Sequence, residues 1–577
     1  MTLNEVFKYD WLVVLIDPAK KQVTEIVNNQ EQLQQFFDEN KNDVWVGYNN
    51  NHYDQYILKA ILLGMNPKTV NDWIIEKEKR GYEYSSLFRK IQMNNYDVMN
   101  RTDRGLKFFE GCMGSMIKES SIPFNIDRKL TESEIQETLK YCRHDVEQTI
   151  QVFLRKIDDF NAHMGLVKLA SIGKLSTDLS LIGKTKAQLS AHILNARQKP
   201  HDDEFDIDFP YTLVLNKYTN VLDWYKNPEN RCYKRSNDRK TQLETMVAGC
   251  PHQFGWGGVH GALEKYTGSG LFLMCDVASL YPSLMIHYNL HSRNMDDPKK
   301  YEEIYHTRLK YKKEKNPLQA PLKLVLNSTY GVMKDKGNGL YDPLQANKVC
   351  VYGQLLLLDL IEKLEPHCQL IQSNTDGILI RMPDGKDPNK WFEKIDDLAY
   401  EWEKRTGLVL EFEEYVKVFQ KDVNNYVIIS ADGKYKSKGA YVKKLSDLDY
   451  GDFPIVNKAL VEYMTKGIPV ERTINNCDTL KDFQMVTKIG RKYEHLTHGG
   501  KILNEKCVRV FASIRSGDGD LKKKSIRTGN TEKVANSPDR CFLYNDEVNG
   551  VKVPDYLDKQ FYINMAKKRL EDYGVIV

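Results

Sequence analysis

The sequence predicts an α/β protein built from several domains. Its 577 residues are enough for about four domains at the usual size of about 150 residues each. Strand patterns alternate with helix patterns over roughly the first 190 residues, which is typical of an α/β domain. Hydrophobic residues make up 41% and charged residues 28% of the chain, a globular composition that excludes wholesale disorder.

The N-terminal elements follow from apolar runs and turn signals. Residues 5–16 and 21–27 are apolar-rich strand candidates separated by the turn at Asp17-Pro18. Residues 44–48 predict a short strand and 56–63 a helix. Residues 130–155 have helical spacing without Pro or Gly, and Thr131 and Glu134 fit a capping box at the start of that helix.

The rest of the chain alternates irregular and regular stretches. Residues 198–255 are polar, aromatic and interrupted by prolines, so we expect a connecting region without a clear fold. A Gly-rich stretch precedes a strong strand at 271–277, and residues 300–335 read as two helices separated by a Pro317–Pro321 turn. Residues 369–380 read as a hairpin with an acidic tip. Beyond position 430 the composition becomes Lys-rich.

Composition and charge exclude some classes of protein. The longest clean apolar run, 11–16, is far shorter than the ~20 residues of a membrane span, and no basic segment precedes it. We therefore expect neither an integral membrane protein nor an exported one. The 10 cysteines stand singly, which favours reduced thiols in a cytosolic protein over a disulfide or zinc scaffold. A net charge of +4 neither supports nor excludes a polyanionic partner.

Three short segments carry the chemistry. Asp276 ends the strand at 271–277, where a carboxylate can hold a cation near solvent while the sheet fixes its backbone. Lys323, Asn327 and Tyr330 recur at helical spacing and share one face, which suits a triphosphate and a stacked base. Asp376 lies at the hairpin tip.

Asp276 and Asp376 stand 100 residues apart, yet each is expected at a strand end. If the two strands are neighbours, both carboxylates converge on one pair of metal ions. Mg²⁺ in phosphoryl-transfer sites takes one or two carboxylates plus substrate oxygens, and two such ions about 3.5–4 Å apart stabilise an in-line displacement.

These segments resemble motifs A, B and C of the family B (polymerase-α-like) DNA polymerases of the compact bacteriophage type. The resemblance implies an RNase H-like 3′→5′ exonuclease domain followed by a right-hand polymerase with palm, fingers and thumb. It also implies primer–template DNA and dNTPs as partners, two Mg²⁺ ions for which Mn²⁺ can substitute, replication accessory proteins, and location in the cytoplasm of a host cell. The implied domains are an exonuclease-like domain at 1–190, a connecting region at 191–255, a palm at 256–299 and 336–430, fingers at 300–335 and a thumb at 431–577.

The resemblance also assigns roles to polymerase residues by motif. Asp276 and Asp376 would bind metal, with the Val277 carbonyl as a third ligand, and Tyr281 would stack under the deoxyribose and exclude a 2′-hydroxyl. Lys323 would grip the incoming phosphates. The remaining implied nucleotide contacts are Asn327, Tyr330, Ser279, Leu280, Arg308 and Lys312.

Some of these assignments have ordinary alternatives. Arg308 and Lys312 lie one helical turn apart, where the family places a phosphate-binding pair, but they also fit a solvated basic face. Gly257 and Gly258 resemble an element that touches the template strand, or they form a plain turn. Further implied DNA contacts are Thr487, Gly490, Arg491 and the lysine-rich run 434–444, which surface charge alone would also explain.

Two departures from the family pattern bear on activity. Asn374 stands where the first carboxylate of motif C is usual; it can orient neighbours by hydrogen bonds but cannot neutralise Mg²⁺. Because Asp376 is the metal-binding position in most members, we expect polymerase activity to survive.

The second departure is in the exonuclease motifs. Glu5, Asp54, Tyr141 and Asp145 match them, with Tyr141 orienting the attacking water, but Leu3 stands where the first motif has Asp. A leucine cannot coordinate a metal, so the resemblance implies a weakened or inactive exonuclease. Asp10 and Asp17 are nearby, and we expect them to be surface carboxylates of the hairpin.

Both the mode of priming and the main activity have alternatives that fit parts of the sequence. Asp276 and Lys323 are only 47 positions apart, which favours an ordinary nucleic-acid primer over the insertion of protein-primed members. Residues 199–255 could still hold a contact surface for a priming protein. The alternatives are a nuclease as the main activity, a catalytically silent DNA-binding replication factor, and a ribonucleotide polymerase or primase. The missing first carboxylate opposes the nuclease, the retained Asp276, Asp376 and Lys323 oppose the silent factor, and Tyr281 opposes the primase.

Overall fold

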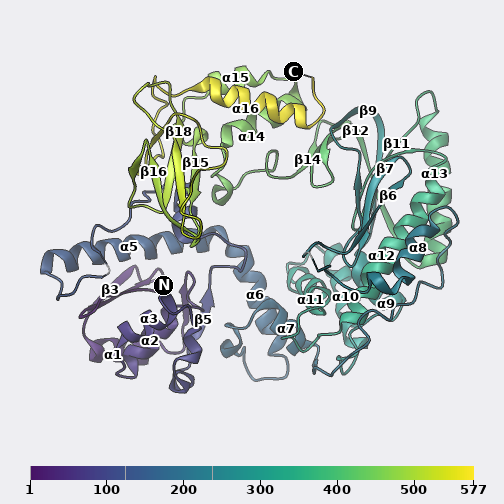
Figure 1. Cartoon of the computed structure of the whole chain (residues 1–577). Coiled ribbons are helices and arrows are strands. Elements are labelled where there is room, and N and C mark those ends of the chain that lie inside the picture. The colour runs from purple at the N-terminus through teal and green to yellow at the C-terminus, as the bar shows by residue number, and fades with distance from the viewer. Residues whose placement is uncertain (1, 124, 237, 577) are drawn as a thin grey trace. The chain divides into compact units, whose positions relative to one another are not determined.

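The computed structural model describes residues 2–123, 125–236 and 238–576, with side chains from Glu5 onward. The chain divides into two compact units (Figure 1). The N-terminal unit contains residues 1–185, 445–454 and 477–561, and the central unit contains residues 186–444, 455–476 and 562–577. The mixed α/β, multidomain fold class expected from the sequence is confirmed.

The first part of the N-terminal unit combines two small sheets with six α-helices. Strands β1, β2 and β3 form an antiparallel sheet, and β4 pairs with β5 in parallel. The elements are β1 (Thr2–Val6), β2 (Trp11–Asp17), β3 (Gln22–Val27), α1 (Gln30–Asn40), β4 (Val44–Gly47), α2 (Asp54–Leu62), α3 (Pro67–Ile75), β5 (Asn94–Asp97), α4 (Leu106–Met113), α5 (Glu132–Arg155) and α6 (Ile157–Ala170), with short 3₁₀ helices η1 (Gly81–Glu83), η2 (Ser86–Lys90) and η3 (Leu179–Leu181).

The expected single strand at 5–16 is wrong. The chain reverses between β1 and β2, where the Phe7 N–H donates to the Asp10 carbonyl at 2.8 Å. The expectation that Asp10 is a surface carboxylate is also wrong, because its side chain is only 5% exposed. Its two oxygens accept hydrogen bonds from the Asn28 amide at 2.7 Å and the Leu130 N–H at 2.8 Å. Asp10 therefore ties the hairpin to the segment that leads into α5.

Helix α5 begins as the sequence predicted. Thr131 is its N-cap, and the reciprocal hydrogen bonds of a capping box join Thr131 and Glu134. These bonds satisfy backbone N–H groups that have no partner within the helix. The helix packs Leu139, Cys142 and Val146 against β2 and thereby fixes the side chains it carries relative to that sheet.

The second part of the N-terminal unit is mostly strands. Its two antiparallel sheets have the orders β15-β18-β21 and β17-β16-β19-β20. The elements are η5 (Asp447–Asp449), η6 (Leu480–Phe483), β15 (Met485–Lys488), β16 (Tyr493–His498), β17 (Lys501–Ile502), β18 (Cys507–Ala512), β19 (Leu521–Ser525), β20 (Thr531–Lys533) and β21 (Cys541–Leu543). Arg509 of β18 is fully buried and donates to the carbonyls of Gly111 and Ser115 at the end of α4. This guanidinium joins the two parts of the unit, because it lies on β18 and donates to carbonyls in and just after α4.

The central unit is organised around a nine-stranded sheet of order β14-β13-β12-β9-β11-β10-β8-β7-β6, in which all neighbouring pairs are antiparallel. The strands are β6 (Gln242–Val247), β7 (Cys250–Gly255), β8 (His260–Ala262), β9 (Tyr266–Val277), β10 (Gln369–Asn374), β11 (Gly377–Arg381), β12 (Leu410–Asp422), β13 (Asn425–Ile429) and β14 (Tyr435–Lys438).

The central unit also contains helices, several of which lie beside this sheet (Figure 1). They are α7 (Lys186–Ile193), α8 (Thr219–Lys226), α9 (Leu280–His287), α10 (Lys299–Lys313), α11 (Gln319–Val332), α12 (Pro343–Leu364) and α13 (Pro388–Thr406), with α15 (Val470–Asn475), most of α14 (Pro454–Lys466) and α16 (Lys559–Asp572), and 3₁₀ helix η4 (Pro228–Asn230). Helix α12 is buried along almost its whole length, and the Trp402 indole of α13 donates to the Leu356 carbonyl. Helix α12 is therefore the central support of this unit.

Two segments are arranged differently from the simplest sequence interpretation. Residues 198–255, for which the sequence indicated no clear fold, contribute α8 and the edge strands β6 and β7 of the large sheet. Residues 431–577 divide between the two units. In the described part of the chain, no helix is both long enough and apolar enough to cross a membrane.

Candidate active site

Two carboxylates from distant parts of the sequence meet at one edge of the central sheet. Strands β9 and β11 are neighbours, and Asp276 at the end of β9 stands opposite Gly377 at the start of β11. Asp376 immediately precedes Gly377, and its carbonyl accepts from the Val277 N–H at 2.7 Å. The structure thus brings Asp276, Val277 and Asp376 together, as the sequence argument required.

Gly377 makes this approach possible. A Cβ at position 377 would lie 1.9 Å from Oδ1 of Asp276, far inside van der Waals contact. The preceding turn adopts a positive φ of 59° at Thr375 and is held by the Thr375 N–H, which donates to the Val259 carbonyl at 2.9 Å. The hairpin tip is therefore shaped around the Asp276 carboxylate.

The two carboxylates share a cavity of about 150 Å³ with Lys436 and Lys438 of β14. Burial, and then the negative charge of Asp376, raise the pKa of Asp276 to about 6. Desolvation likewise raises the pKa of Asp376, against the charge of Lys438. Two partly desolvated carboxylates that repel each other form a donor set that a divalent cation stabilises, so these residues fit the Mg²⁺ that the motifs imply.

Asn374 has a structural reason to differ from the usual carboxylate. Its side-chain amide donates a hydrogen bond to the Val423 carbonyl at 3.2 Å, across to the turn between β12 and β13. An ionised Asp has no donor and could not make this bond. Asn374 therefore anchors the hairpin, and it also lines the cavity.

The predicted nucleotide-binding residues of α11 lie as the helical spacing implied. Lys323 and Asn327 are exposed, and Tyr330 is half-buried. The Tyr330 ring lies against Tyr281 of α9, with centroids 4.1 Å apart and planes inclined by 36°. The Tyr330 hydroxyl contacts Sγ of Cys350 in α12 at 2.6 Å. The two rings, supported from behind by α12, give a rigid aromatic surface.

Arg308 and Lys312 of α10 differ in their surroundings. Arg308 is only 8% exposed, and its guanidinium donates to Oγ of Ser279 at 3.0 Å, beside the turn that follows Asp276. Its Nε has no hydrogen-bond partner among the described residues. Lys312 is exposed and lies 3.6 Å from Glu411. The solvated-face alternative therefore does not describe Arg308, but it does describe Lys312 in this structure.

Ser279 and Leu280 begin α9. Ser279 has a positive φ of 52°, which turns the chain sharply from β9 into the helix. The Leu280 side chain is buried against Gly353 of α12. A nucleotide contact by Leu280 would therefore have to come from its backbone.

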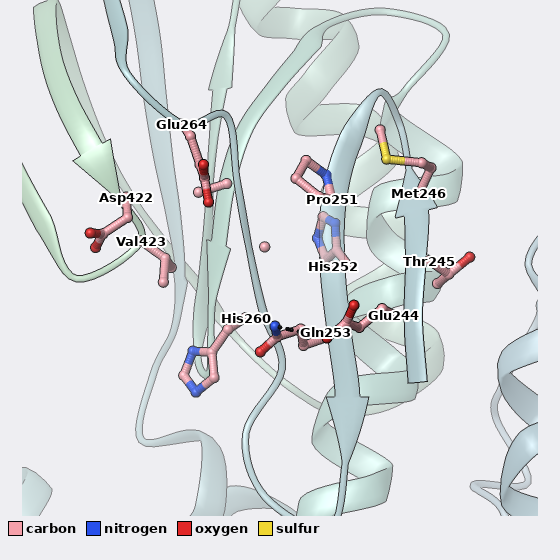
Figure 2. Close-up of a pocket in the computed structure, with 12 residues that line it drawn as sticks. Glu244, Thr245, Met246, Pro251, His252, Gln253, His260, Glu264, Asp422 and Val423 are labelled. Atoms are coloured by element: carbon pink, nitrogen blue, oxygen red, sulfur yellow. Dashed lines mark hydrogen bonds between the residues drawn. The ribbon is translucent and has the colours of Figure 1, made fainter. Parts of the chain in front are cut away.

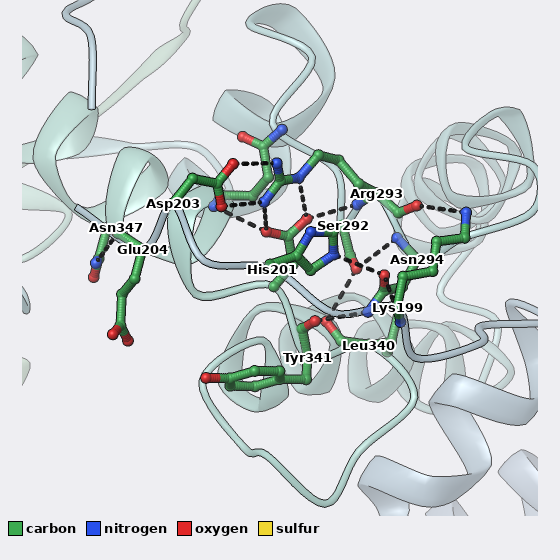
Figure 3. Close-up of polar contacts among 12 residues, drawn as sticks. Lys199, His201, Asp203, Glu204, Ser292, Arg293, Asn294, Leu340, Tyr341 and Asn347 are labelled. Carbon is green, nitrogen blue, oxygen red and sulfur yellow. Dashed lines mark hydrogen bonds and ion pairs between the residues drawn. The ribbon is translucent and has the colours of Figure 1, made fainter. Parts of the chain in front are cut away.

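A polar cluster joins the segment before α10 to the segment after α11, and Figure 3 shows its hydrogen bonds and ion pairs. Arg293, before α10, makes ion pairs with Asp342 at 2.7 Å and Asp203 at 2.6 Å. Asp342, after α11, is fully buried, is the N-cap of α12 and accepts from the Arg293 N–H at 2.8 Å. The Ser292 hydroxyl and the Asn294 amide donate to the carbonyls of Leu340 and Tyr341. We call Arg293, Asp342 and Asp203 the Arg293 clamp.

The predicted DNA contacts lie in both units. In the central unit, a Cβ on Gly258 would lie 2.7 Å from Oγ1 of Thr375, whereas Gly257 has open space around it. Gly258 thus has a packing role beside the hairpin tip, which supports the plain-turn alternative at that position. In the N-terminal unit, Thr487 lies in β15, Gly490 has open space, and Arg491 is 82% exposed beside Glu78.

A second group of carboxylates lies in the N-terminal unit. Glu5 comes from β1, Asp54 from the start of α2 and Asp145 from α5. Burial, followed by the charges of Asp145 and Asp54, raises the pKa of Glu5 to about 8, so these groups are close enough to repel one another. The Tyr141 hydroxyl donates to Glu119 at 3.1 Å. The structure therefore brings the four predicted exonuclease residues together. The side chain of Leu3 lies outside the described residues.

Three members of this second group were not predicted from the sequence: Lys107 and Glu110 of α4 and His144 of α5. The Lys107 ammonium lies 2.7 Å from Asp145 and 3.1 Å from Glu110. His144 Nε2 lies 3.6 Å from Glu110. The i, i+3 spacing of Lys107 and Glu110 was a signal for an ion pair, but nothing in the sequence indicated that the pair is buried.

A larger pocket in the central unit, of about 400 Å³, is lined by strands β6, β7 and β8 and the turn after β12 (Figure 2). Its acidic members are Glu244, Glu264 and Asp422, and among the described residues that line it none is Lys or Arg. Such a lining repels phosphates. The cavity with Lys436 and Lys438 is therefore the better candidate for a nucleotide site, although it is smaller.

Comparisons with known proteins give relatives but no family model that matches the chain. The chain is 26% identical over 307 residues to DNA polymerase 1 of Saccharolobus solfataricus, a match covering 44% of this chain and 33% of that protein. It is 25% identical over 361 residues to DNA polymerase 1 of Sulfurisphaera ohwakuensis, covering 51% and 38%. It is 26% identical over 232 residues to DNA polymerase 1 of Aeropyrum pernix, covering 31% and 24%.

The chain is a relative of these DNA polymerases in sequence, as its resemblance to the family B motifs implied. The recognition drawn from the motifs is thereby confirmed, while the bacteriophage qualifier stays a prediction. The matched segments span only about a quarter to two fifths of these archaeal relatives. A solved structure of the family B DNA polymerase from Pyrobaculum calidifontis aligns over 98% of this chain and 75% of its own, with 14% identity and a TM-score of 0.42.

Proposed function

We propose that this chain is a template-directed DNA polymerase that extends a DNA 3′-OH with dNTPs by two-metal phosphoryl transfer. The observation that carries the proposal is the convergence of Asp276 and Asp376 on one cavity at the edge of the central sheet. Kinship with DNA polymerases in sequence supports it independently.

In this proposal each side chain has a distinct task. Asp276 and Asp376 hold the metal ions, with the Val277 carbonyl as a third ligand. When bound, Mg²⁺ activates the attacking 3′-oxygen and neutralises charge on the transferring phosphoryl group. Lys323 and Arg308 bind phosphate oxygens, with Asn327, Ser279, Lys312 and the Leu280 backbone completing the set. Positioning and charge neutralisation of this kind supply most of the catalysis in phosphoryl transfer.

The aromatic pair selects the sugar. Tyr281 and Tyr330 form a packed surface next to the carboxylates, and we assign Tyr281 to the face of the deoxyribose. A ribose 2′-hydroxyl would then meet the ring, so the substrate is a deoxynucleotide. This assignment opposes the ribonucleotide polymerase alternative.

The parts of the chain receive corresponding roles. The nine-stranded sheet acts as the palm, the α10–α11 pair as the fingers, and residues beyond 431, including the lysine-rich run 434–444, Thr487, Gly490 and Arg491, contact the primer duplex. Gly257 touches the template strand. Residues 1–185 form an exonuclease-like domain with weak or no hydrolysis. The bacteriophage origin, a host-cytoplasmic location, Mn²⁺ as a substitute ion and accessory proteins stay predictions of the motif resemblance.

The test is extension of a 5′-labelled DNA primer on a longer template, with Mg²⁺ and with or without dNTPs. We expect extension to the template end with dNTPs, and little shortening of the primer without them. Binding of the duplex without any extension would contradict the proposal and favour a catalytically silent DNA-binding factor or a protein-primed enzyme. Rapid shortening with no extension would favour the nuclease alternative.

A further inference from the structure

The carboxylate group in the N-terminal unit contains a buried lysine that the exonuclease motifs do not explain. Lys107 lies in α4 and is 6% exposed. Its ammonium lies 2.7 Å from Oδ1 of Asp145 and 3.1 Å from Oε2 of Glu110, and 4.6 Å from the centre of the Tyr141 ring. The lysine therefore touches the carboxylate and the aromatic residue of the third exonuclease motif at once.

A purely stabilising role explains this arrangement poorly. A buried ion pair recovers little more than the cost of removing both charges from water, and apolar side chains often replace it without loss. Here the Glu110 side chain is fully buried, and its Oε1 has no hydrogen-bond partner among the described residues. The cluster therefore holds more carboxylate oxygen than Lys107 and His144 satisfy, which points to a role in charge balance rather than in packing.

The ligand set of the site fits fewer metal ions than a two-metal exonuclease requires. Glu5, Asp54 and Asp145 supply carboxylates, but the chain has Leu3 at the position of the fourth. A leucine has no ligand atom. One divalent cation can be held by three carboxylates, and the ammonium at Asp145 already supplies a further positive charge. The residues present therefore fit one divalent cation and one lysine.

We propose that the ammonium of Lys107 takes the place of one of the two divalent cations at this site. The inference rests on the proposed exonuclease-like role of residues 1–185. An ammonium neutralises Asp145 as a fixed point charge, but it cannot lower the pKa of a bound water as a divalent cation does. Hydrolysis at such a site is expected to be slow, in keeping with the departure at Leu3.

Removal of the lysine should leave room for a metal ion. Glu110, His144 and Asp145 each present a ligand atom, and these three atoms all lie within 4.8 Å of one another. Carboxylate and imidazole suit Mn²⁺ as well as other divalent cations. Lys107→Met keeps most of the apolar stem while it deletes the charge, so the variant is expected to gain one bound ion.

The test counts tightly bound Mn²⁺ per chain by electron paramagnetic resonance. The full-length chain carries Asp276→Asn and Asp376→Asn in every sample, which removes the ligands proposed for the polymerase site. Ions at the N-terminal site are those lost when Asp145→Asn is added, because Asp145 belongs to both ligand sets. We expect one such ion in this background, two with Lys107→Met, and one with Lys107→Arg. Lys140→Met, an exposed lysine of the same helix as Asp145, is the matched control and should leave the count at one.

Two ions in the background, or no gain with Lys107→Met, would overturn the inference. Should Lys107→Met fail to fold, as judged by circular dichroism, Lys107→Gln keeps a hydrogen-bond donor to Asp145 and is expected to show the same gain. Digestion of a 5′-labelled single strand is measured separately. Rapid hydrolysis with a count of one would contradict the weakened exonuclease of the proposed function but leave the replacement of a metal ion by Lys107 intact.

Discussion

Gly377 is the residue at which the geometry of the central carboxylates is most tightly constrained. A methyl group there would lie 1.9 Å from Asp276, so Gly377→Ala must rotate the Asp276 carboxylate away while the flexible side chain absorbs the clash. A displacement of about 1 Å at a reacting centre can cost about 10²-fold in rate. We expect a loss of primer extension of that order with an unchanged melting temperature.

The matched control for this variant is Gly517→Ala, because Gly517 has open space around it. It should retain full extension. Normal extension by Gly377→Ala would show that Asp276 is not held in a required position.

Asp276 also makes stability depend on pH. Its pKa is raised to about 6 in the folded, metal-free chain, whereas an unfolded Asp titrates near 3.9. Between these values the folded state binds more protons, so stability falls as pH rises from about 4 to 6 and stays lower above that range. We therefore expect Asp276→Asn to raise the melting temperature of the metal-free chain at pH 7.5 and to change it little at pH 4.

Mg²⁺ supplies the control for this prediction. The ion compensates the repulsion between the carboxylates, so it should stabilise the wild-type chain more than Asp276→Asn. A melting temperature that is lower in Asp276→Asn at pH 7.5 would contradict the idea that these carboxylates are strained without a cation.

Tyr281 tests the identity of the sugar. Tyr281→Ala removes the ring that we place against the deoxyribose, so incorporation of ribonucleotides relative to deoxynucleotides should rise by about 10- to 100-fold. Tyr281→Phe keeps the ring and is expected to keep the discrimination. Competition between one rNTP and its matching dNTP in single-nucleotide extension measures the ratio, and equal ratios in all three proteins would remove Tyr281 from the sugar site.

At the scale of elements, the Arg293 clamp determines whether α10 and α11 present their side chains in a fixed position. Arg293→Met leaves Asp342 buried without its ionic partner. Breaking a buried pair costs about 3–5 kcal/mol, and we expect about 2–3 kcal/mol because Arg293 is one-third exposed. The KM for dNTPs should rise while duplex affinity is retained, since the helix pair is proposed to bind the nucleotide.

Asp203→Asn is the matched comparison for the clamp. It breaks only the ion pair on the more exposed side of Arg293, so its effect on stability and on KM should be clearly smaller. Equal effects of the two variants, measured by urea unfolding and steady-state kinetics, would contradict the assignment of Asp342 as the central member of the clamp.

Several elements could be predicted because their signals are local. The capping box at Thr131, the two helices around Pro317 and the hairpin around Asp376 all depend on neighbouring residues, and each is present. The second helix begins at Gln319, inside the turn expected at 317–321. The reversal between β1 and β2 was missed because residues 5–16 are rich in apolar residues and contain neither Gly nor Pro to mark a turn. The fold of 198–255 was missed because β6 and β7 obtain their order from pairing in a large sheet, which local propensity does not report.

The residues of the candidate sites also separate into those with a local sequence signal and those whose positions depend on tertiary packing. Asp276 and Asp376 could be predicted because each lies beside a strong strand signal. The two carboxylates come together through a single strand pairing, that of β9 with β11. The buried positions of Lys107, Glu110 and Arg308 depend on packing between elements far apart in sequence. No periodicity in a single segment could have shown that Arg308 faces the turn after Asp276 instead of solvent.

At the scale of the whole molecule, each compact unit is built from segments that lie far apart in the sequence. Residues 445–454 and 477–561 belong to the same compact unit as residues 1–185, while 455–476 and 562–577 belong to the central unit. Residues 445–577 therefore cannot be removed without exposing the interior of both units. The proposed polymerase activity nevertheless depends on one site, the Asp276–Asp376 carboxylate pair at the edge of the central sheet.

The most direct test of that account is the single-turnover rate of template-directed addition of one dNTP to a DNA primer. In Mg²⁺, the wild-type chain should add only the nucleotide complementary to the template. Asp376→Asn should lower this rate by about 10²-fold or more, because it removes charge that stabilises the transition state, with duplex affinity unchanged. Asp384→Asn, an exposed aspartate paired with Arg381 beyond the same hairpin, should match the wild type. Near-normal addition by Asp376→Asn, or no template-directed addition by the wild-type chain, would contradict the central claim.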